Sequence, residues 1–224
     1  MTRETYQQSL ADLEADVHEM GALVLDRFEQ ALESLATGDE TLAREVMAGD
    51  TEINDRYLEL EERCVDLFAL QQPVASDLRF VTASFKIITD LERVGDLATN
   101  VARYATAATR DFDDLVPLVD IGREAATLLE RSLEAYVDGD AVASRAIAAA
   151  DDDVDALCER ANETVTRELI EREATDDAWT VEEVLDDVSR VLLTIRDLER
   201  VADHAVNIAA RTQYMVENDP ALIY

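Results

Sequence analysis

The chain has 224 residues, with 51 Asp or Glu against 20 Lys or Arg, and a formal net charge of −31. Its 48% apolar residues can form a core, which argues against a wholly disordered chain. A pI near 4.1 argues against binding to nucleic acid, whose phosphates repel such a surface. No apolar run approaches the roughly 18 residues of a membrane span, and residues 1–10 lack the apolar core of a signal peptide. We therefore expect a cytoplasmic protein.

The acidic residues are spread along the whole chain rather than gathered in a tail. The basic residues are almost all Arg, with Lys86 as the single Lys. A uniform acidic coat keeps a protein soluble where concentrated salt screens its self-repulsion. We therefore expect a salt-loving source, in which most carboxylates belong to the coat.

Helix is predicted almost throughout, because Gly and Pro are scarce and apolar residues recur at three- and four-residue steps. Asp39 is placed to cap the second helix, and Ser76 or Asp77 to cap the third. Punctuating residues divide the chain into six helices, with breaks at residues 37–39, 71–73, 110–117, 138–140 and 174–180. Long helices with short connections favour antiparallel bundles.

The chain contains an internal duplication. A shift of 101 residues aligns equivalent points of the two halves: Gly38 with Gly139, Asp39 with Asp140, and Asp50 with Asp151. A shift of 107 aligns DLERVGDLATNVA (residues 90–102) with DLERVADHAVNIA (residues 197–209). We therefore predict an all-α protein of two tandem pseudo-symmetric three-helix bundles, residues 1–110 and residues 111–224.

The third and sixth helices each combine an apolar seam with a polar ladder. The seam of the third helix is Ile87, Leu91, Val94, Ala98, Val101 and Ala105. At about 100° per residue, Glu92, Asp96 and Asn100 lie roughly 100° to 180° from Leu91, away from the core. The sixth helix repeats this ladder with Glu199, Asp203 and Asn207.

Carboxylates one turn apart repel each other unless a positive charge lies between them. Arg93 and Arg200 can supply that charge, which would make the ladders ordinary ion-paired surface. A metal ion is the other solution, because oxygen ligands one turn apart can share a cation. The polar face recurs together with the seam, whereas a core requirement would preserve only the seam. This favours a metal- or partner-binding surface and leaves the ion-paired surface open.

The two LERV strings and QQPVASDLR (residues 71–79) resemble the PhoU family of phosphate-signalling regulators over nearly the full chain. With the acidic composition, the resemblance suggests a halophilic archaeon as the source. It implies multinuclear metal clusters, of iron, zinc or another divalent ion, on the bundle surface. The implied ligands are Glu92, Asp96, Glu199 and Asp203, with Asn100 and Asn207 as weaker candidates.

The resemblance also implies a function. The chain would regulate phosphate uptake and starvation signalling by docking on the ATP-binding subunit of the phosphate ABC transporter, its only route to the membrane. A sensor kinase is a further implied partner, and a homodimer the implied assembly. The candidate partner contacts are Arg93, Arg200, Asp77 and Arg79, although the second half has no match to the PVASDLR string.

Other interpretations are weighed beside this one. The sequence offers no set of nucleophile, base and oxyanion site, so we do not expect an enzyme. The alternative function is a metal-storing or metal-buffering helical protein, and a scaffold whose acid is only salt adaptation is a third. We expect Cys64 and Cys158 to be buried, reduced thiols, and His204 to pack rather than to bind metal.

Overall fold

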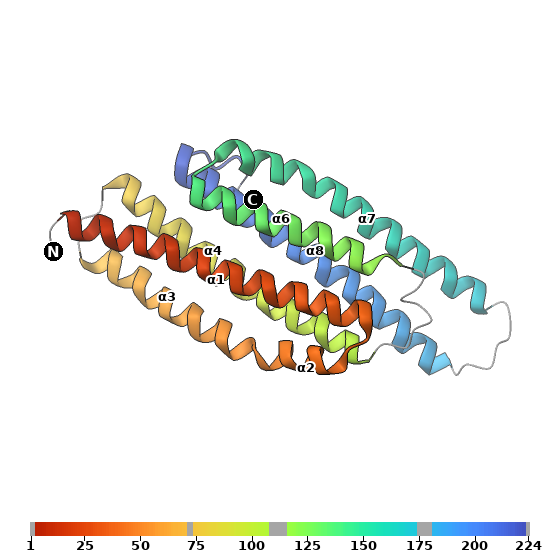
Figure 1. Cartoon of the computed structure of the whole chain (residues 1–224). Helices are drawn as coiled ribbons and strands as arrows, with labels where there is room; N and C mark the ends of the chain where they lie inside the picture. Colours follow the sequence, from red (N-terminus) through yellow and green to blue (C-terminus); the bar gives the residue numbers. More distant parts are fainter. Residues whose placement is uncertain (1–2, 71–73, 108–115, 174–180, 223–224) are drawn as a thin grey trace.

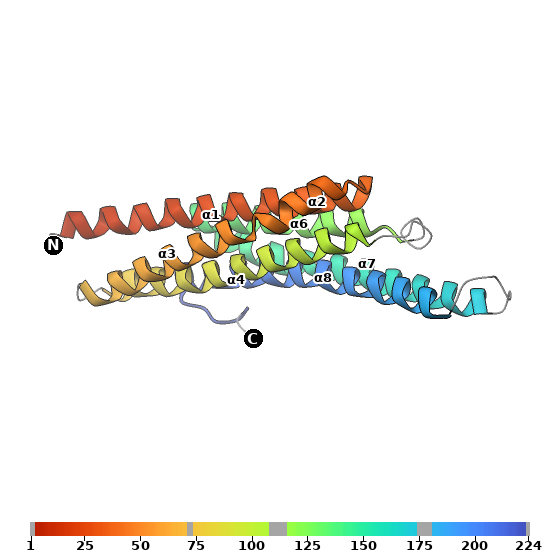
Figure 2. The same cartoon turned by 90° about the horizontal axis from the view of Figure 1, so that it is seen from below.

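The computed structural model describes residues 3–70, 74–107, 116–173 and 181–222, and helices account for almost all of these ranges. The helices are α1 (Arg3–Thr37), α2 (Glu40–Ala48), α3 (Asp50–Leu70), α4 (Ala75–Thr106), α6 (Leu118–Asp138), α7 (Ala141–Glu173) and α8 (Val181–Glu217). They run along the length of an elongated body (Figures 1 and 2). The all-α prediction is confirmed. Within the described ranges, no helix combines the length and the apolar character needed to cross a membrane.

The predicted helix ends at the first break of each half are confirmed. Gly38 and Gly139 have φ of 68° and 62°, a conformation that a side chain disfavours. Asp39 then accepts hydrogen bonds from the backbone N–H groups of Thr41 and Leu42. Asp140 does the same for the first turn of α7, accepting from Val142 and Ala143. The same local chemistry therefore starts the second helix of each half.

Two details of the helix prediction are wrong. The third predicted helix begins at Ala75, so its N-cap is Val74 rather than Ser76 or Asp77, and Val74 makes no side-chain hydrogen bond. The second predicted helix is interrupted at Gly49, which separates α2 from α3. The predicted breaks at residues 71–73 and 174–180 lie outside the described residues, as does the predicted boundary between residues 110 and 111.

The two halves pack about an approximate two-fold axis. Helices α1, α2–α3 and α4 of the first half correspond to α6, α7 and α8 of the second (Figure 1). Where α1 meets α6, a Cβ added at Gly21 would overlap Leu133, and a Cβ added at Gly122 would overlap Leu32. Both the glycines and the leucines are 101 residues apart, so each half inserts the same leucine into the same gap of the other.

Helices α4 and α8 form the other contact between the halves. The predicted seam of the third helix is confirmed, because its residues are at most 7% exposed and all but Ala105 belong to one continuous apolar core. The seam of the sixth helix belongs to the same core through Ile195, Leu198, Val201, Ala205 and Ile208. Two polar contacts flank them: Asp90 lies 2.9 Å from Nδ1 of His204, and the Tyr104 hydroxyl donates to Asp197 at 3.0 Å. Asp90 and Asp197 are equivalent positions, so each half directs the same carboxylate at the other. His204 therefore packs against the opposite repeat, as predicted.

Both cysteines lie in the core. Cys64 and Cys158 are buried free thiols, which confirms the prediction. Burial, followed by the nearby Glu199 carboxylate, raises the pKa of Cys158 to about 12. This thiol therefore stays protonated near neutral pH and is a poor nucleophile.

Candidate functional site

The first-half ladder lies against the start of α3. Glu92 and Asp96 project from α4, away from the apolar seam, and their side chains are 18% and 44% exposed. Burial raises the pKa of Glu92, with Asp96 and then Asp50 adding to the rise. Helical periodicity predicts that this ladder faces outward, but the Glu92 side chain is largely covered, whereas Asp96 is half-exposed. Asp50 is a third carboxylate of this site.

Asp50 is held by donors from two helices. The Asn54 amide donates to Asp50 Oδ2 at 3.0 Å, one turn along α3. The Thr99 hydroxyl, on α4, donates to Asp50 Oδ1 at 3.4 Å. We call Asp50, Asn54, Glu92 and Asp96 the first acidic cluster.

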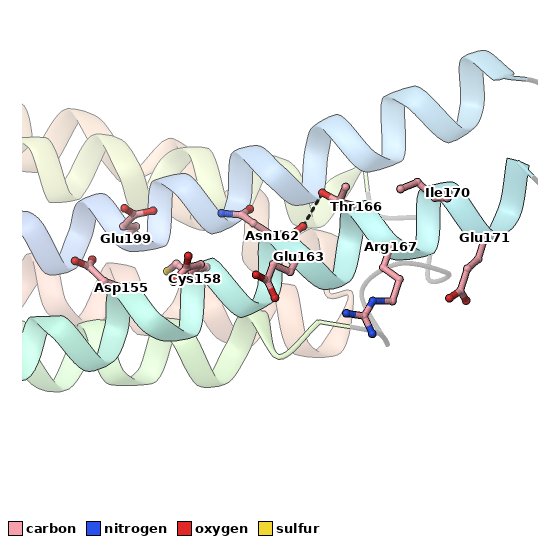
Figure 3. A pocket seen from close by; sticks show the side chains of 10 residues that line it. Asp155, Cys158, Asn162, Glu163, Thr166, Arg167, Ile170, Glu171 and Glu199 are labelled. Carbon is pink, nitrogen blue, oxygen red and sulfur yellow. Dashed lines mark hydrogen bonds between the residues drawn. The ribbon is translucent and has the colours of Figure 1, made fainter.

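The second half contains an equivalent site with one more carboxylate. Asp151 and Asp155 of α7 lie beside Glu199 and Asp203 of α8, and we call these four residues the second acidic cluster. Figure 3 shows Asp155 and Glu199 directed toward each other from the two helices. Burial is the largest cause of the raised pKa of Glu199 and of Asp203, followed in both by Asp155.

Asp151 is the most perturbed of these acids. Burial, followed by Asp155 and Asp203, raises the pKa of Asp151 to about 6. Its Oδ1 atom is buried and has no hydrogen-bond partner. A buried carboxylate oxygen without a donor is costly, so this atom marks a position where a positive group would stabilise the chain.

Small residues let the paired helices approach at these clusters. A Cβ added at Gly95 would lie 3.0 Å from Cδ1 of Ile53, so α4 packs closely on α3 at this point. The second half has Ala202 and Val154 at the equivalent positions. Its residue on α8 is therefore larger than in the first half, and its residue on α7 is smaller. The volume is shared differently, and the helices still bring both pairs of acids together.

The remaining predicted ligands have other partners. The Asn207 amide donates to Asp90 of the opposite half at 3.3 Å, and Asn100 accepts from Arg103 at 3.0 Å. Both are thus engaged away from the carboxylates of their clusters, and neither extends its ladder. In the described ranges, no three Asp, Glu, His or Cys side chains converge into a ready-made cage for an ion.

The predicted partner contacts fall into two kinds. Arg93 is exposed and lies 3.4 Å from both Glu92 and Asp96, so it is the positive charge of the first ladder. Arg200, its equivalent, instead lies 3.9 Å from Asp197, a fully buried carboxylate.

Asp77 lies largely buried next to α1. It is 8% exposed and lies 4.0 Å from Arg3 of α1. Burial raises the pKa of the neighbouring Tyr6, and the Asp77 charge adds to the rise. Arg79 is half-buried, with its Nε atom inside the protein. A carboxylate this covered exposes little surface to a partner, and Asp77 as a partner contact stays a prediction.

A groove of about 750 Å³ runs along α7 next to the second acidic cluster. Figure 3 shows Asp155, Cys158 and Glu199 at one end of it and Ile170 toward the other. Further carboxylates, Glu159 and Glu163, line it, so its surface is strongly acidic. The surface around the second cluster therefore offers both a hollow and a high negative charge to a partner.

The duplicated helical body and its paired acidic clusters define a class of two-repeat helical proteins, and comparison with known proteins specifies it. A family model described as "PhoU domain" matches residues 17–105 and 118–212. The chain belongs to the PhoU domain family.

Similar proteins share nearly the whole length of the chain. A protein of Clostridium acetobutylicum, named phosphate-specific transport system accessory protein PhoU homolog, is 29% identical over 219 residues and 96% of each chain. The crystal structure of PhoU from Pseudomonas aeruginosa has a TM-score of 0.86 and 29% identity, covering 96% of this chain and 100% of that one. The phosphate transport system regulatory protein PhoU from Streptococcus pneumoniae has a TM-score of 0.83 and 26% identity, covering 96% and 99%.

Sequence reasoning missed Asp50, Asp151 and Asp155 as members of the site. A signal for them was present, because the 101-residue shift aligns Asp50 with Asp151 at the same point of each half. What periodicity could not supply was the identity of the helix that covers each ladder.

Proposed function

We propose that the chain regulates phosphate uptake by docking on the ATP-binding subunit of a phosphate ABC transporter. The names of the similar proteins from C. acetobutylicum and S. pneumoniae, an accessory and a regulatory protein of phosphate transport, support this role. Within the chain, the supporting observation is the acidic cluster that recurs in both halves. A purely structural role would not require partly buried, mutually repelling carboxylates at the same place twice.

We further propose that each acidic cluster holds divalent cations. Carboxylate and amide oxygens suit hard divalent ions, and the unpartnered Asp151 Oδ1 is the atom such a site would satisfy. In the first half the ligands would be Asp50, Asn54, Glu92 and Asp96, and in the second Asp151, Asp155, Glu199 and Asp203. A bound cation would neutralise these acids and tie α3 to α4 and α7 to α8.

Docking would use the exposed edge of each cluster. Asp96 is half-exposed and Asp203 is exposed, so both are accessible to a basic surface on a partner. Opposite charges accelerate encounter and fix the orientation of a complex. A homodimer and a sensor-kinase partner stay predictions.

The test compares two sets of four substitutions. In the site variant, Glu92→Gln, Asp96→Asn, Glu199→Gln and Asp203→Asn remove the charge and keep the shape. In the control variant, the exposed acids Glu29, Glu33, Glu130 and Glu134 of α1 and α6 become Gln, which removes the same charge from another surface. Capture of the ATP-binding subunit and radiolabelled phosphate uptake in cells are measured for both.

We expect the site variant to lose capture and to release phosphate uptake from control, while the other variant keeps both. Undiminished capture together with unchanged uptake would remove these residues from the mechanism. Elemental analysis of the untagged protein tests the metal separately. Loss of metal in the site variant, with capture and uptake intact, would favour the metal-storing alternative.

A further inference from the structure

Exposed apolar side chains occupy the outer surface of α7 and α8 near the start of α8. Leu185, Leu192 and Glu199 are spaced seven residues apart, so they lie within about 40° of one another on one face of α8. The two leucines are 52% and 37% exposed. On α7, Ile170 is 65% exposed and lies toward the end of the groove away from Asp155 (Figure 3). A partner that removes these side chains from water would gain free energy of binding.

The apolar positions of α8 recur in the first half. The 107-residue shift aligns three positions of α4 with three of α8: Leu78 with Leu185, Phe85 with Leu192, and Glu92 with Glu199. Leu78 is 44% exposed, and Phe85 is partly buried against the core. Isolated exposed apolar residues are normal on a protein surface. Two that recur at matching positions of both halves indicate a requirement beyond folding.

The groove beside these residues in the second half has the length and the charge to seat a helix. It extends along α7 from Asp155 to Glu171, and we call it the α7 groove. This distance corresponds to about 16 residues, or roughly 24 Å of helix. Five of the residues that line the described groove are acidic and one is basic. A segment bound there would therefore need basic side chains for the rim and apolar ones for Ile170, Leu185 and Leu192.

We propose that the α7 groove binds a basic amphipathic helix of a partner protein. Its apolar side chains would cover Ile170, Leu185 and Leu192, and its Lys or Arg side chains would meet the acidic rim. Amphipathic helices bind to grooves in this way, through apolar anchors at helical spacing. The inference rests on the proposed docking and specifies the kind of segment that docks.

Charge and apolar surface have different roles in this site. The acidic coat covers the whole chain, so it attracts a basic partner to every face and selects none of them. The exposed apolar residues supply the position. A second copy of this chain also carries a charge of −31, so its surface would be repelled from the groove. The same charge repels anionic lipid, and a basic helix is the occupant that both features favour.

The test uses a fluorescently labelled synthetic peptide of Leu and Lys, about 16 residues long, with its Leu residues on one helical face. Fluorescence anisotropy measures its affinity for the full-length chain in about 0.5 M KCl, which screens attraction to the rest of the coat. The groove variant carries Leu185→Gln and Leu192→Gln. The control variant carries Val142→Gln and Val216→Gln, which remove two exposed apolar side chains from the other end of the α7–α8 pair.

We expect the groove variant to bind the peptide at least about ten-fold more weakly, and the control variant to stay within about two-fold of the parent. Ile170→Gln, on the other helix, should weaken binding in the same direction. A permuted peptide of equal composition but without an apolar face should bind the parent at least about ten-fold more weakly. Equal affinities of the groove and control variants, or of the two peptides, would mean that charge alone drives binding and would overturn the proposal.

Two further measurements separate the remaining explanations. Far-UV circular dichroism verifies that each variant folds. Sedimentation equilibrium tests the second copy: a dimer of the parent that the groove variant loses and the control variant keeps would place another chain on this surface and overturn the proposal.

The peptide assay contains no transporter subunit, so its failure leaves docking on the ATP-binding subunit to its own test. A chain whose groove binds the peptide but which does not capture that subunit would defeat only the proposed function.

Discussion

Asp151 shows how strongly position changes an ordinary side chain in this acidic protein. Most of the 51 acidic residues form a surface coat. An exposed carboxylate in water is more stable ionised than protonated near neutral pH. Asp151 is partly covered by its own helix pair and faces other carboxylates, and these two causes raise its pKa to about 6. Ionisation of Asp151 is therefore less favourable in the folded chain than in the unfolded one.

The stability of the metal-free chain should depend on pH through this residue. Between about pH 4 and pH 6 the folded chain holds a proton on Asp151 that the unfolded chain releases, so stability falls as pH rises through this range. Asp151→Asn removes the titrating group and should flatten the dependence. Thermal unfolding in EDTA at about pH 4 and about pH 6 measures the difference. If the variant and the parent lose equal stability over this range, Asp151 is not the responsible group.

At the scale of helices, the clusters depend on how closely α3 and α7 approach α4 and α8. The first half uses Ile53 against Gly95, and the second uses Val154 against Ala202. Relative to the first half, the second half has one more methyl group on α8 and one fewer on α7. The two pairs contain the same number of side-chain carbon atoms, as expected where a close-packed interior fixes the available space.

We therefore expect the first half to tolerate Gly95→Ala and Ile53→Val together better than either substitution alone. Gly95→Ala gains about 1 kcal/mol of helix propensity but places a Cβ 3.0 Å from Ile53 Cδ1, and such overpacking costs about 1–3 kcal/mol. Ile53→Val removes the contact with Cδ1 and leaves the one with Cγ2 at 3.1 Å, so the clash is partly relieved. We therefore expect a favourable coupling of at least about 0.5 kcal/mol. Urea unfolding of the double-mutant cycle measures it.

The control for this cycle combines Gly95→Ala with Ile147→Val, a buried site on α7 of the other half. These two changes should add without coupling. A coupling as large as that with Ile53 would mean that the effect does not come from the contact between α3 and α4.

At the scale of the whole molecule, the charge of −31 opposes folding, because a compact chain holds its charges closer than an unfolded one. Arg56 and Arg63 relieve part of this repulsion by pairing α3 with acids of α1, and both pairs are only partly covered. Such surface pairs contribute little each. Screening of the charges by salt lowers the remaining repulsion.

We therefore expect the melting temperature to rise as KCl increases from about 0.1 M to about 2 M. The control is an uncharged osmolyte at matched osmotic pressure, which does not screen charge. A melting temperature that responds equally to both, or not to KCl, would contradict the interpretation of the acidic coat as salt adaptation.

Much of the fold follows from local rules of the sequence. Gly38 and Gly139 with their following Asp caps, and the seam from Ile87 to Ala105, lie where periodicity and turn chemistry predict them, because these features involve residues close together in the chain. The duplication predicted two equivalent halves for the same reason. Sequence also identified Glu92, Asp96, Glu199 and Asp203 as unusual, since their face recurs after 107 residues.

Tertiary structure alone decided what faces these acids. Helical periodicity states which side of a helix is polar, but the neighbour on that side depends on how all the helices pack. That packing placed Asp50 and Asp151 beside the ladders and turned Asn207 toward Asp90 of the other half. It also gave Asp50 a hydrogen bond from Thr99 and left Asp151 Oδ1 without a donor, because Thr99 and Val206 matter only once α4 and α8 lie against their partner helices.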